Sequence, residues 1–419
     1  MDSHGSETKF SIYVPARPGG GGRLANVTGR VSRKDKQNPF AGIEKQSYAE
    51  VIKTCQERGI LFEDPEFPAD DSSLYYKSGG NFSVEWKRPS EICQDPKFFV
   101  GGASRFDVKQ GMLGDCWLLA AIASLTINKK VFYRVVPPEQ YFNKNYTGCF
   151  RFNLWNQGKW VEILVDDRLP TQNGRLIYMH SVDENEFWSA LLEKVYAKLN
   201  GSYESLKGGN TSEAMEDFTG GITEQIDLKD PPKKLFGIMQ KAFQRCSMMG
   251  CSIDAVPGQT EAKLSNGLIC GHAYSITGLN MNGLKTPSIN GKILMVRIRN
   301  PWGESEWNGP WSDQSPEWRF IPDHEKKDMG LINDDDGEFW FALFFLRWAV
   351  EGNGGALVGE EGSLPYLVKL LVPLLFLLVK QGQIVPWSSL PAGSFLSLSH
   401  LLMPRGSRRR HILYFHQLL

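Results

Sequence analysis

One cysteine lies where a glycine-containing turn gives way to a long apolar helix. Cys116 follows Gly114 and Asp115 and opens the apolar run Trp117–Ile122. Because backbone N–H groups at a helix N-terminus and the helix dipole favour negative charge, this position favours a nucleophilic thiolate. The side-chain amide of Gln110, earlier in the same segment, can donate to an oxyanion formed by attack of that sulfur. The alternative is a buried helix cysteine without chemistry, which is the commoner fate of a lone cysteine.

Two later segments supply the partners that such a thiol needs. The segment Gly271–Gly278 predicts a short strand that begins at a glycine, with His272 at its start, and the β-type run Ile293–Arg299 ends at Asn300. A histidine can take the thiol proton and return it to a leaving amine, while an asparagine amide holds the imidazole in one tautomer. Taken singly, the histidine is typical of a structural residue and the asparagine of a turn. Together, the order Cys, His, Asn predicts a papain-type triad.

These segments resemble the three active-site blocks of the calpain family, and other blocks of the chain resemble that family as well. The similar segments are Gln110–Trp117, Asn185–Lys194, Asn200–Glu204, Glu216–Gly221, Gly271–Ser275, Arg299–Gly303 and Asp336–Trp340. The resemblance extends from about Tyr48 to about Leu343. It implies an α+β, papain-like cysteine protease core of two lobes, with a helix-rich first lobe and a β-rich second lobe.

The resemblance also implies a role for each residue of the catalytic site. Cys116 is expected to be the nucleophile and His272 the general acid and base. Asn300 is expected to orient the imidazole, and Gln110 to donate a hydrogen bond to the oxyanion. Because the cysteine and the histidine fall on different lobes, the triad works only when the lobes close to about 3 Å between base and nucleophile.

Three further residues are implied in substrate binding. By resemblance, Gly208 and Gly209 form the floor of the cleft, where Gly209 pairs with the backbone of an extended substrate. Trp302 would stand between the lobes and move when the triad assembles. Without the resemblance, the two glycines are typical of a linker and the tryptophan of a core residue.

Calcium is the cofactor that the resemblance implies, because its binding to each lobe drives closure in calpains. Calcium takes six to eight oxygen ligands at about 2.3–2.6 Å. The implied ligands of the first lobe are the carbonyls of Val100 and Gly102 and the carboxylates of Asp107 and Glu186. Those of the second lobe are the carboxylates of Glu306, Asp313, Asp336 and Glu338 and the carbonyl of Asp334. An ion pair between Arg105 and Glu338 is implied as the coupling between the two sites.

From the residues alone, these acids are more typical of solvated loops than of a metal site. Neither set fits the EF-hand pattern, since Ile332 stands where the first loop aspartate would be. The acidic pair Asp166–Asp167 is interpreted in the same way, as surface. The calcium sites therefore rest on the resemblance and not on ligand spacing.

Composition limits the class of partner. The chain has 419 residues with 47 basic and 47 acidic side chains, so no global field favours nucleic acid or membrane. Its seven cysteines are scattered and lack CxxC spacing, which argues against a disulfide framework and against a zinc site. The N-terminal segment lacks an apolar stretch of the secretory type. We therefore expect a reducing, cytoplasmic location.

The sequence divides into four stretches. They are a mobile leader over residues 1–45, a first protease lobe over 46–209, a second lobe over 210–343 and a tail outside the family over 344–419. The first lobe has helix candidates at Tyr48–Arg58, which Gly59 ends, and at Glu186–Leu199, which Asn200 and Gly201 end. The hinge between the lobes is expected near Gly208–Gly209.

The tail is where the chain departs from the family. Calpains continue with another strand of the protease core, a β-sandwich and an EF-hand domain, which the resemblance does not extend to here. The apolar stretch Leu364–Val379 is interrupted by Lys369 and Pro373 and is short for a bilayer span of about 20 residues. We expect a poorly ordered tail, produced by splicing or a change of frame, that lowers solubility. Neither membrane association nor a small subunit is expected.

Together these features predict a calcium-dependent intracellular cysteine endopeptidase that makes limited cuts in proteins. Its expected partners are protein substrates and calpain inhibitor proteins, without nucleic acid. Two alternatives remain open. One is a calcium-independent papain-like hydrolase, in which Asp107 and Glu306 have no function. The other is an inactive truncated isoform that acts as a binding or regulatory protein.

Overall fold

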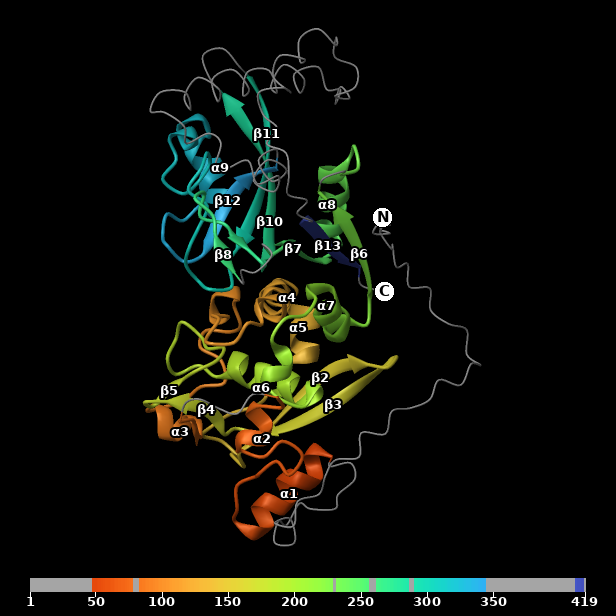
Figure 1. Ribbon diagram of the computed structural model, residues 1–419, viewed down its shortest axis with the longest axis vertical. Coiled ribbons are helices and arrows are strands. Elements are labelled where there is room, and N and C mark those ends of the chain that lie inside the picture. The colour runs from red at the N-terminus through yellow and green to blue at the C-terminus, as the bar shows by residue number, and fades with distance from the viewer. Residues whose placement is uncertain are drawn as a thin grey trace, which may run out of the picture.

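The computed structural model describes residues 47–77, 83–228, 231–255, 261–285, 290–343 and 411–417. It has both helices and sheets, as the α+β class predicts, with a helical half below a half built around a sheet in Figure 1. The predicted leader and most of the predicted tail lie outside the described residues. Among the helices that are described, none is both long enough and apolar enough to cross a bilayer.

The helical half contains most of the helices, and two of them follow the predicted bounds closely. The α-helices are α1 Tyr48–Arg58, α2 Asp71–Leu74, α3 Pro89–Ile92, α4 Cys116–Ile127, α5 Lys129–Val135, α6 Trp188–Asn200, α7 Thr211–Thr219, α8 Leu235–Gln244 and α9 Asp323–Asp328. Helix α1 ends as predicted at Gly59, in the left-handed conformation that glycine favours. Helix α6 begins two residues later than predicted, because the backbone of Asn185 and Phe187 hydrogen-bonds to Lys97 instead.

The strands of the helical half form small sheets at its edge. They are β1 Glu85–Lys87, β2 Cys149–Asn156, β3 Lys159–Asp166, β4 Leu169–Gln172 and β5 Arg175–Leu176. Strands β2 and β3 pair as a hairpin, and β1, β4 and β5 form a three-stranded sheet. Helix α4 runs through the core of this half, and its residues from Cys116 to Thr126 are all buried. The helix that carries the cysteine is therefore held on every side.

A six-stranded antiparallel sheet forms the other half. Its strands are β6 Ile222–Asp227, β7 Met248–Ile253, β10 His272–Lys285, β11 Asn290–Arg299, β12 Glu338–Ala342 and β13 His411–Gln417, in the order β12-β11-β10-β7-β13-β6. A two-stranded sheet of β8 Ala262–Lys263 and β9 Ile269–Cys270 lies beside it. Both predicted strands, which begin at His272 and end at Arg299, belong to this sheet and pair with each other. Strand β10 thus places His272 at its first position.

Strand β13 differs from the expectation of a poorly ordered tail. It pairs antiparallel with β6, from Ile412 opposite Asp227 to Gln417 opposite Ile222. Along its other edge it pairs with β7, where Tyr414 lies opposite Gly250. In Figure 1, β13 is the dark blue arrow between β7 and β6. Seven residues of the tail therefore fill an interior position in the sheet.

Hydrogen bonds join the two halves close to the cysteine helix. The hydroxyl of Ser124 donates to the carbonyl of Met249 at 2.8 Å, and that of Ser275 to the carbonyl of Ala120 at 2.8 Å. Helix α7, which comes directly before β6, packs its buried side chains into the core of the helical half. The change from one core to the other therefore comes after α7, beyond the hinge proposed at Gly208–Gly209.

The pair Asp166–Asp167 is buried, so the interpretation as surface is wrong. Asp166 accepts hydrogen bonds from the Lys194 ammonium at 2.6 Å and from the Arg168 guanidinium at 2.6 Å. Burial opposes its charge, but these cations hold the pKa of Asp166 well below its ordinary value. Asp167 pairs with Arg88. Charge partners from distant segments explain how two adjacent carboxylates can lie in a core.

Candidate active site

Cys116 is the first residue of α4 and opens onto the junction of the two halves. Its relative exposure is 8%. The residue before it, Asp115, is buried against Glu193 of α6. Burial raises the pKa of Asp115 to about 7 and that of Glu193 well above its ordinary value. The protonated forms of Asp115 and Glu193 carry no charge, which limits the negative charge next to Cys116.

The tautomer of His272 is set by its contact with Asn300. The Oδ1 atom of Asn300 lies 2.8 Å from Nε2 of His272. The Nδ2 group of Asn300 donates to the carbonyls of Glu304 at 2.8 Å and Ser305 at 3.1 Å, which fixes the amide with its oxygen toward the imidazole. Nε2 must therefore carry a proton and donate it to Oδ1. Nδ1 is left as the nitrogen that faces the cysteine.

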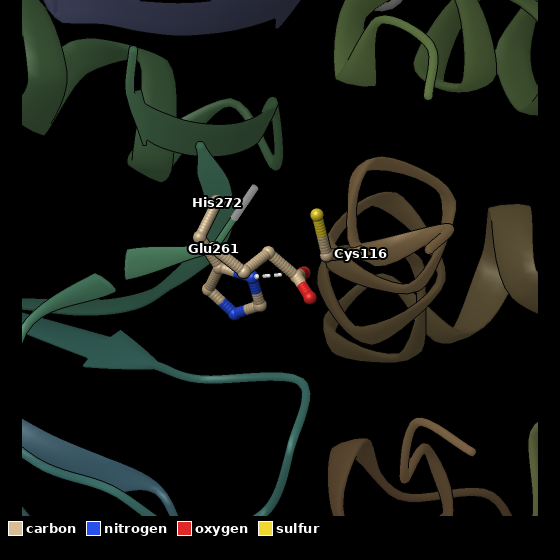
Figure 2. A group of neighbouring side chains, drawn as sticks. All are labelled: Cys116, Glu261 and His272. Carbon is tan, nitrogen blue, oxygen red and sulfur yellow. Dashed lines mark hydrogen bonds and ion pairs between the residues drawn. The ribbon is translucent and has the colours of Figure 1, made fainter. Parts of the chain in front are cut away.

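Nδ1 of His272 meets two groups, the sulfur of Cys116 and the carboxylate of Glu261. The ligand atoms of these three residues lie within 4.8 Å of one another, and Oε1 of Glu261 is 3.1 Å from Nδ1. Figure 2 shows the carboxylate between the imidazole ring and the helix of Cys116. Burial disfavours the imidazolium, but the hydrogen bonds with Cys116, Glu261 and Asn300 prevail and raise the pKa of His272 to about 9. The site thus favours a charged imidazole beside the sulfur.

A cleft of about 510 Å³ opens beside these groups. Cys116, Glu261, His272, Gly208 and Gly209 are among the residues that line it. A Cβ atom on Gly209 would lie 2.3 Å from the ring of Trp117, so only glycine leaves the indole in place. The structure therefore brings both predicted glycines to the same cleft as the cysteine and the histidine.

Trp302 lies behind the histidine and not among the residues that line the cleft. Its ring centroid is 5.0 Å from that of His272, at an interplanar angle of 59°. Its backbone N–H donates to Oδ1 of Asn300 at 3.0 Å, the atom that also accepts from the histidine. In this arrangement the tryptophan supports the imidazole, and its role in substrate binding stays a prediction.

Gln110 is not among the residues that line the cleft, and its side chain hydrogen-bonds within its own loop. Its Nε2 group donates to the carbonyl of Leu113 at 2.6 Å, while Oε1 is buried without a hydrogen-bond partner among the described residues. Its backbone N–H donates to the carbonyl of Pro301 at 2.9 Å, which ties this loop to the segment after Asn300. An amide NH₂ carries two hydrogens, so one donor of Gln110 is not used by Leu113.

The predicted calcium ligands of the helical half cluster around one carboxylate. Glu186 accepts hydrogen bonds from the N–H of Val100 at 2.5 Å and from the hydroxyl of Ser181 at 2.7 Å. Burial, with the nearby charge of Asp107, raises the pKa of Glu186 to about 7. Gly102 lies in the same loop at φ +94°, in the left-handed region. The structure thus brings the side chains of Glu186 and Asp107 together.

The predicted ligands of the second set contain a carboxylate without a partner. Both carboxylate oxygens of Asp313 are buried, and within the described residues neither has a hydrogen-bond partner. Burial, together with the charges of Glu306, Asp336 and Asp334, raises the pKa of Asp313 to about 8. Glu306 accepts from the N–H of Gly337 at 2.8 Å, and burial raises its pKa to about 7. Several carboxylates that repel one another therefore lie close together around Asp313.

The ion pair expected between Arg105 and Glu338 is present. Nε of Arg105 lies 2.6 Å from Oε1 of Glu338, and Nη2 lies 2.6 Å from Oε2. Glu338 also accepts from the hydroxyl of Thr277 at 2.7 Å. Burial opposes its charge, but hydrogen bonds and charges from Arg105 and Arg297 hold the pKa of Glu338 below its ordinary value. The pair joins the loop before α4 to β12 in the opposite half.

Two features of the site escape the sequence patterns. Glu261 comes from an irregular segment before β8, and no spacing relates it to Cys116 or His272. Glu193 lies inside the helix α6, where an acidic residue is typical of an exposed face. Only the positive backbone φ of 51° at Glu261 marks an unusual position, and it is a property of the fold.

Comparison with known proteins agrees with this geometry. The model of the calpain family cysteine protease matches residues 62–345. The chain is 59% identical to Calpain-A of Drosophila melanogaster over 301 residues, which are 72% of this chain and 36% of the relative. It is 57% identical to Calpain clp-1 of Caenorhabditis elegans over 307 residues, which are 73% of this chain and 39% of the relative. It is 52% identical to Calpain-9 of Homo sapiens over 299 residues, which are 71% of this chain and 43% of the relative. It spans less than half the length of these relatives. The chain belongs to the calpain family of cysteine proteases.

Proposed function

We propose that the protein is a calcium-dependent cysteine endopeptidase that makes limited cuts in protein substrates. The observation that supports it most is the contact of Cys116 and His272 across two halves of the fold, with Asn300 fixing the imidazole. The raised pKa of His272 keeps a proton at the nitrogen beside the sulfur. That proton is what the leaving amine of a peptide bond needs.

The first half of the proposed reaction forms an acyl-enzyme. The sulfur of Cys116 attacks the carbonyl carbon of the peptide bond, and the carbonyl electrons move to its oxygen. This oxyanion would be met by the N–H groups at the start of α4 and by the free donor of Gln110. As the C–N bond breaks, Nδ1 of His272 gives its proton to the amine, which leaves.

The second half releases the acid product. Nδ1 of His272, now without its proton, takes a proton from water, and the hydroxide attacks the thioester carbon. The C–S bond breaks, and the new carboxyl terminus leaves. Throughout, the Oδ1 atom of Asn300 accepts from Nε2, so the ring keeps its orientation. The positioning of the imidazole therefore belongs to β10 and the end of β11.

Calcium is proposed as the activating cofactor because the predicted ligands fit a cation. Val100, Gly102, Asp107 and Glu186 would hold one ion, and Glu306, Asp313, Asp334, Asp336 and Glu338 another. The observation that fits a cation best is Asp313, whose two oxygens have no hydrogen-bond partner among the described residues and which lies near the like charges of Glu306, Asp336, Asp334 and Glu338. A bound ion supplies positive charge and six to eight ligand positions. The residues themselves would then hold their loops in fixed positions beside the cleft.

The substrate and the cellular setting follow from the same proposal. An extended segment of a protein would lie along Gly208 and Gly209, with the scissile bond at Cys116. Protein inhibitors of calpains would compete for this cleft. A cytoplasmic location suits a free thiol nucleophile, since reducing compartments keep cysteines from pairing.

The direct test is peptide cleavage by the purified chain as a function of free calcium. We expect cleavage of casein and of a fluorogenic peptide in calcium, and loss of both when EGTA removes it. Cys116→Ser serves as the blank. Cleavage that survives EGTA would instead indicate a calcium-independent hydrolase. A folded chain that binds casein without cutting it at any calcium concentration would indicate a binding or regulatory isoform.

Loss of the Arg105–Glu338 ion pair should weaken the response to calcium. Arg105→Ala removes both hydrogen bonds to Glu338 and leaves the Arg297 guanidinium, at 3.3 Å, as a partner of that carboxylate. Coupling free energies between sites are typically about 1–3 kcal/mol, so we expect a higher calcium midpoint and a lower Hill slope. The measurement is peptide cleavage across a calcium titration.

Arg105→Lys is the matched control, because it keeps the charge and loses the bidentate geometry. Its midpoint should lie between those of the wild type and Arg105→Ala. An activation curve for Arg105→Ala that superimposes on the wild-type curve would exclude the ion pair from calcium coupling.

A further inference from the structure

Glu261 has no part in the reaction proposed above, yet its carboxylate lies beside the reacting atoms. Its Oε1 is 3.1 Å from Nδ1 of His272, and the sulfur of Cys116 lies within 4.8 Å of both ligand atoms. Among the described residues, this is the one group of three histidine, cysteine or acidic side chains gathered this closely. Figure 2 shows the three side chains converging from both halves of the fold.

The donor types select one class of metal. Thiolate and imidazole suit Zn²⁺ and related transition metals, whereas Ca²⁺ and Mg²⁺ take oxygen ligands. Zinc bonds of about 2.0–2.3 Å place tetrahedral ligands about 3.3–3.8 Å apart. The three ligand atoms of Cys116, Glu261 and His272 lie within 4.8 Å of one another, and Nδ1 of His272 and Oε1 of Glu261 are 3.1 Å apart. Small side-chain movements would bring them to one ion.

The surroundings of the histidine match those of a zinc ligand. Such a ligand donates its second ring N–H to a fixed acceptor, which sets the tautomer. Here Oδ1 of Asn300 accepts from Nε2 at 2.8 Å, and the amide is itself held by two backbone carbonyls. Once Nδ1 loses its proton, its lone pair points toward the other two donors. The open cleft leaves a fourth position for water.

We propose that Cys116, Glu261 and His272 form a zinc-binding site that reversibly blocks the cleft. On binding, the proton on Nδ1 of His272, and the thiol proton where it is present, leave to solvent, and the sulfur and nitrogen lone pairs are bound by the metal. Because those lone pairs carry the reaction, a zinc-bound chain cannot cleave peptides. The inhibition rests on the proposed function, but the binding does not.

The sequence predicts that the chain has no zinc site, and the proposed site departs from that prediction. The cysteines of the chain lack the CxxC spacing that is typical of zinc sites in a sequence. The three ligands lie instead on α4, on the segment before β8 and on β10, so they meet only when the two halves are in contact. The spacing of these residues in the sequence therefore cannot predict the site.

Cobalt(II) is the probe of choice, because a cobalt–thiolate bond gives a charge-transfer absorption that reports on the cysteine directly. The full chain should bind one Co²⁺ with this absorption, and Zn²⁺ should displace it. Cys116→Ser should abolish the absorption, and Glu261→Gln should weaken affinity about tenfold or more. Cys246→Ser, at an exposed cysteine, and Glu139→Gln, at an exposed carboxylate, are the matched controls and should bind as the wild type does.

Zinc inhibition of peptide cleavage is the second readout. In excess calcium, Zn²⁺ should inhibit the wild type, a zinc chelator should restore activity, and Glu261→Gln should need about tenfold more zinc or more. Cobalt–thiolate absorption that persists in Cys116→Ser, or equal affinities of Glu261→Gln and the wild type, would overturn the site. A chain that binds cobalt as described but cleaves no peptide would refute the proposed function and leave the site standing. A chain that cleaves peptides without binding cobalt would refute the zinc site and leave the proposed function standing.

Discussion

Replacing Cys116 with serine is expected to lower kcat/KM for a peptide substrate by about 10⁴-fold or more. A serine hydroxyl is a far weaker nucleophile beside an imidazole that is already protonated, and the raised pKa of His272 favours that charged form. The change is nearly isosteric at a residue with 8% exposure, so the helix α4 should form as before. The measurement is cleavage of a fluorogenic peptide at saturating calcium.

Cys246→Ser is the matched control for this prediction. Cys246 is exposed, lies after α8 and lines no part of the cleft. Its variant should keep wild-type kcat/KM, and circular dichroism should show the same fold for both variants. If Cys116→Ser retains more than about a hundredth of the activity, another nucleophile carries out the reaction and the proposed role of Cys116 falls.

Removal of strand β13 is expected to prevent the second half from folding. A chain that stops before His411 leaves β6 and β7 without the strand that lies between them. Each backbone hydrogen bond contributes about 0.5–1.5 kcal/mol, so two lost ladders together are comparable with the roughly 5–15 kcal/mol that stabilises a whole domain. We expect aggregation and loss of activity. Light scattering and the yield of soluble protein measure the aggregation.

A proline in the strand separates loss of pairing from loss of chain length. Tyr414 lies opposite Gln225 on one side and Gly250 on the other, and a proline there has no N–H to donate. Tyr414→Pro should aggregate as the deletion does, while Leu418→Pro, beyond the strand, should not. Soluble, calcium-activated Tyr414→Pro protein would show that β13 is dispensable.

The sequence was most informative where a residue type is dictated by local chemistry. The helix that begins at Cys116, the strand that begins at His272 and the strand that ends before Asn300 all occur, although β10 continues to Lys285, beyond the predicted end at Gly278, and β11 begins at Asn290 rather than at Ile293. Each is marked by an apolar run that ends at a glycine, a proline or a polar residue. The ion pair between Arg105 and Glu338 came from family resemblance, and no local pattern would have indicated it.

What the sequence could not show depends on contacts between distant segments. An acidic pair such as Asp166–Asp167 is usually solvated and predicts surface, but Lys194 and Arg168 neutralise Asp166 in the core. Glu261 reaches the imidazole only because two halves of the fold meet. The tail strand His411–Gln417 was missed because its pairing partners lie far back in the chain. Its position depends on an opening between β6 and β7 that only the folded sheet creates.

That opening has a consequence for protein synthesis. The ribosome completes β6 and β7 when it reaches Ile253 and must still translate up to His411 before their common neighbour exists. At about 5–20 residues per second, this interval is on the order of ten seconds. Throughout it, the nascent chain presents two unpaired strand edges to every other chain on the polysome. Its yield in cells should therefore depend on translation speed and on chaperones that shield strand edges, more than on the stability of the folded protein.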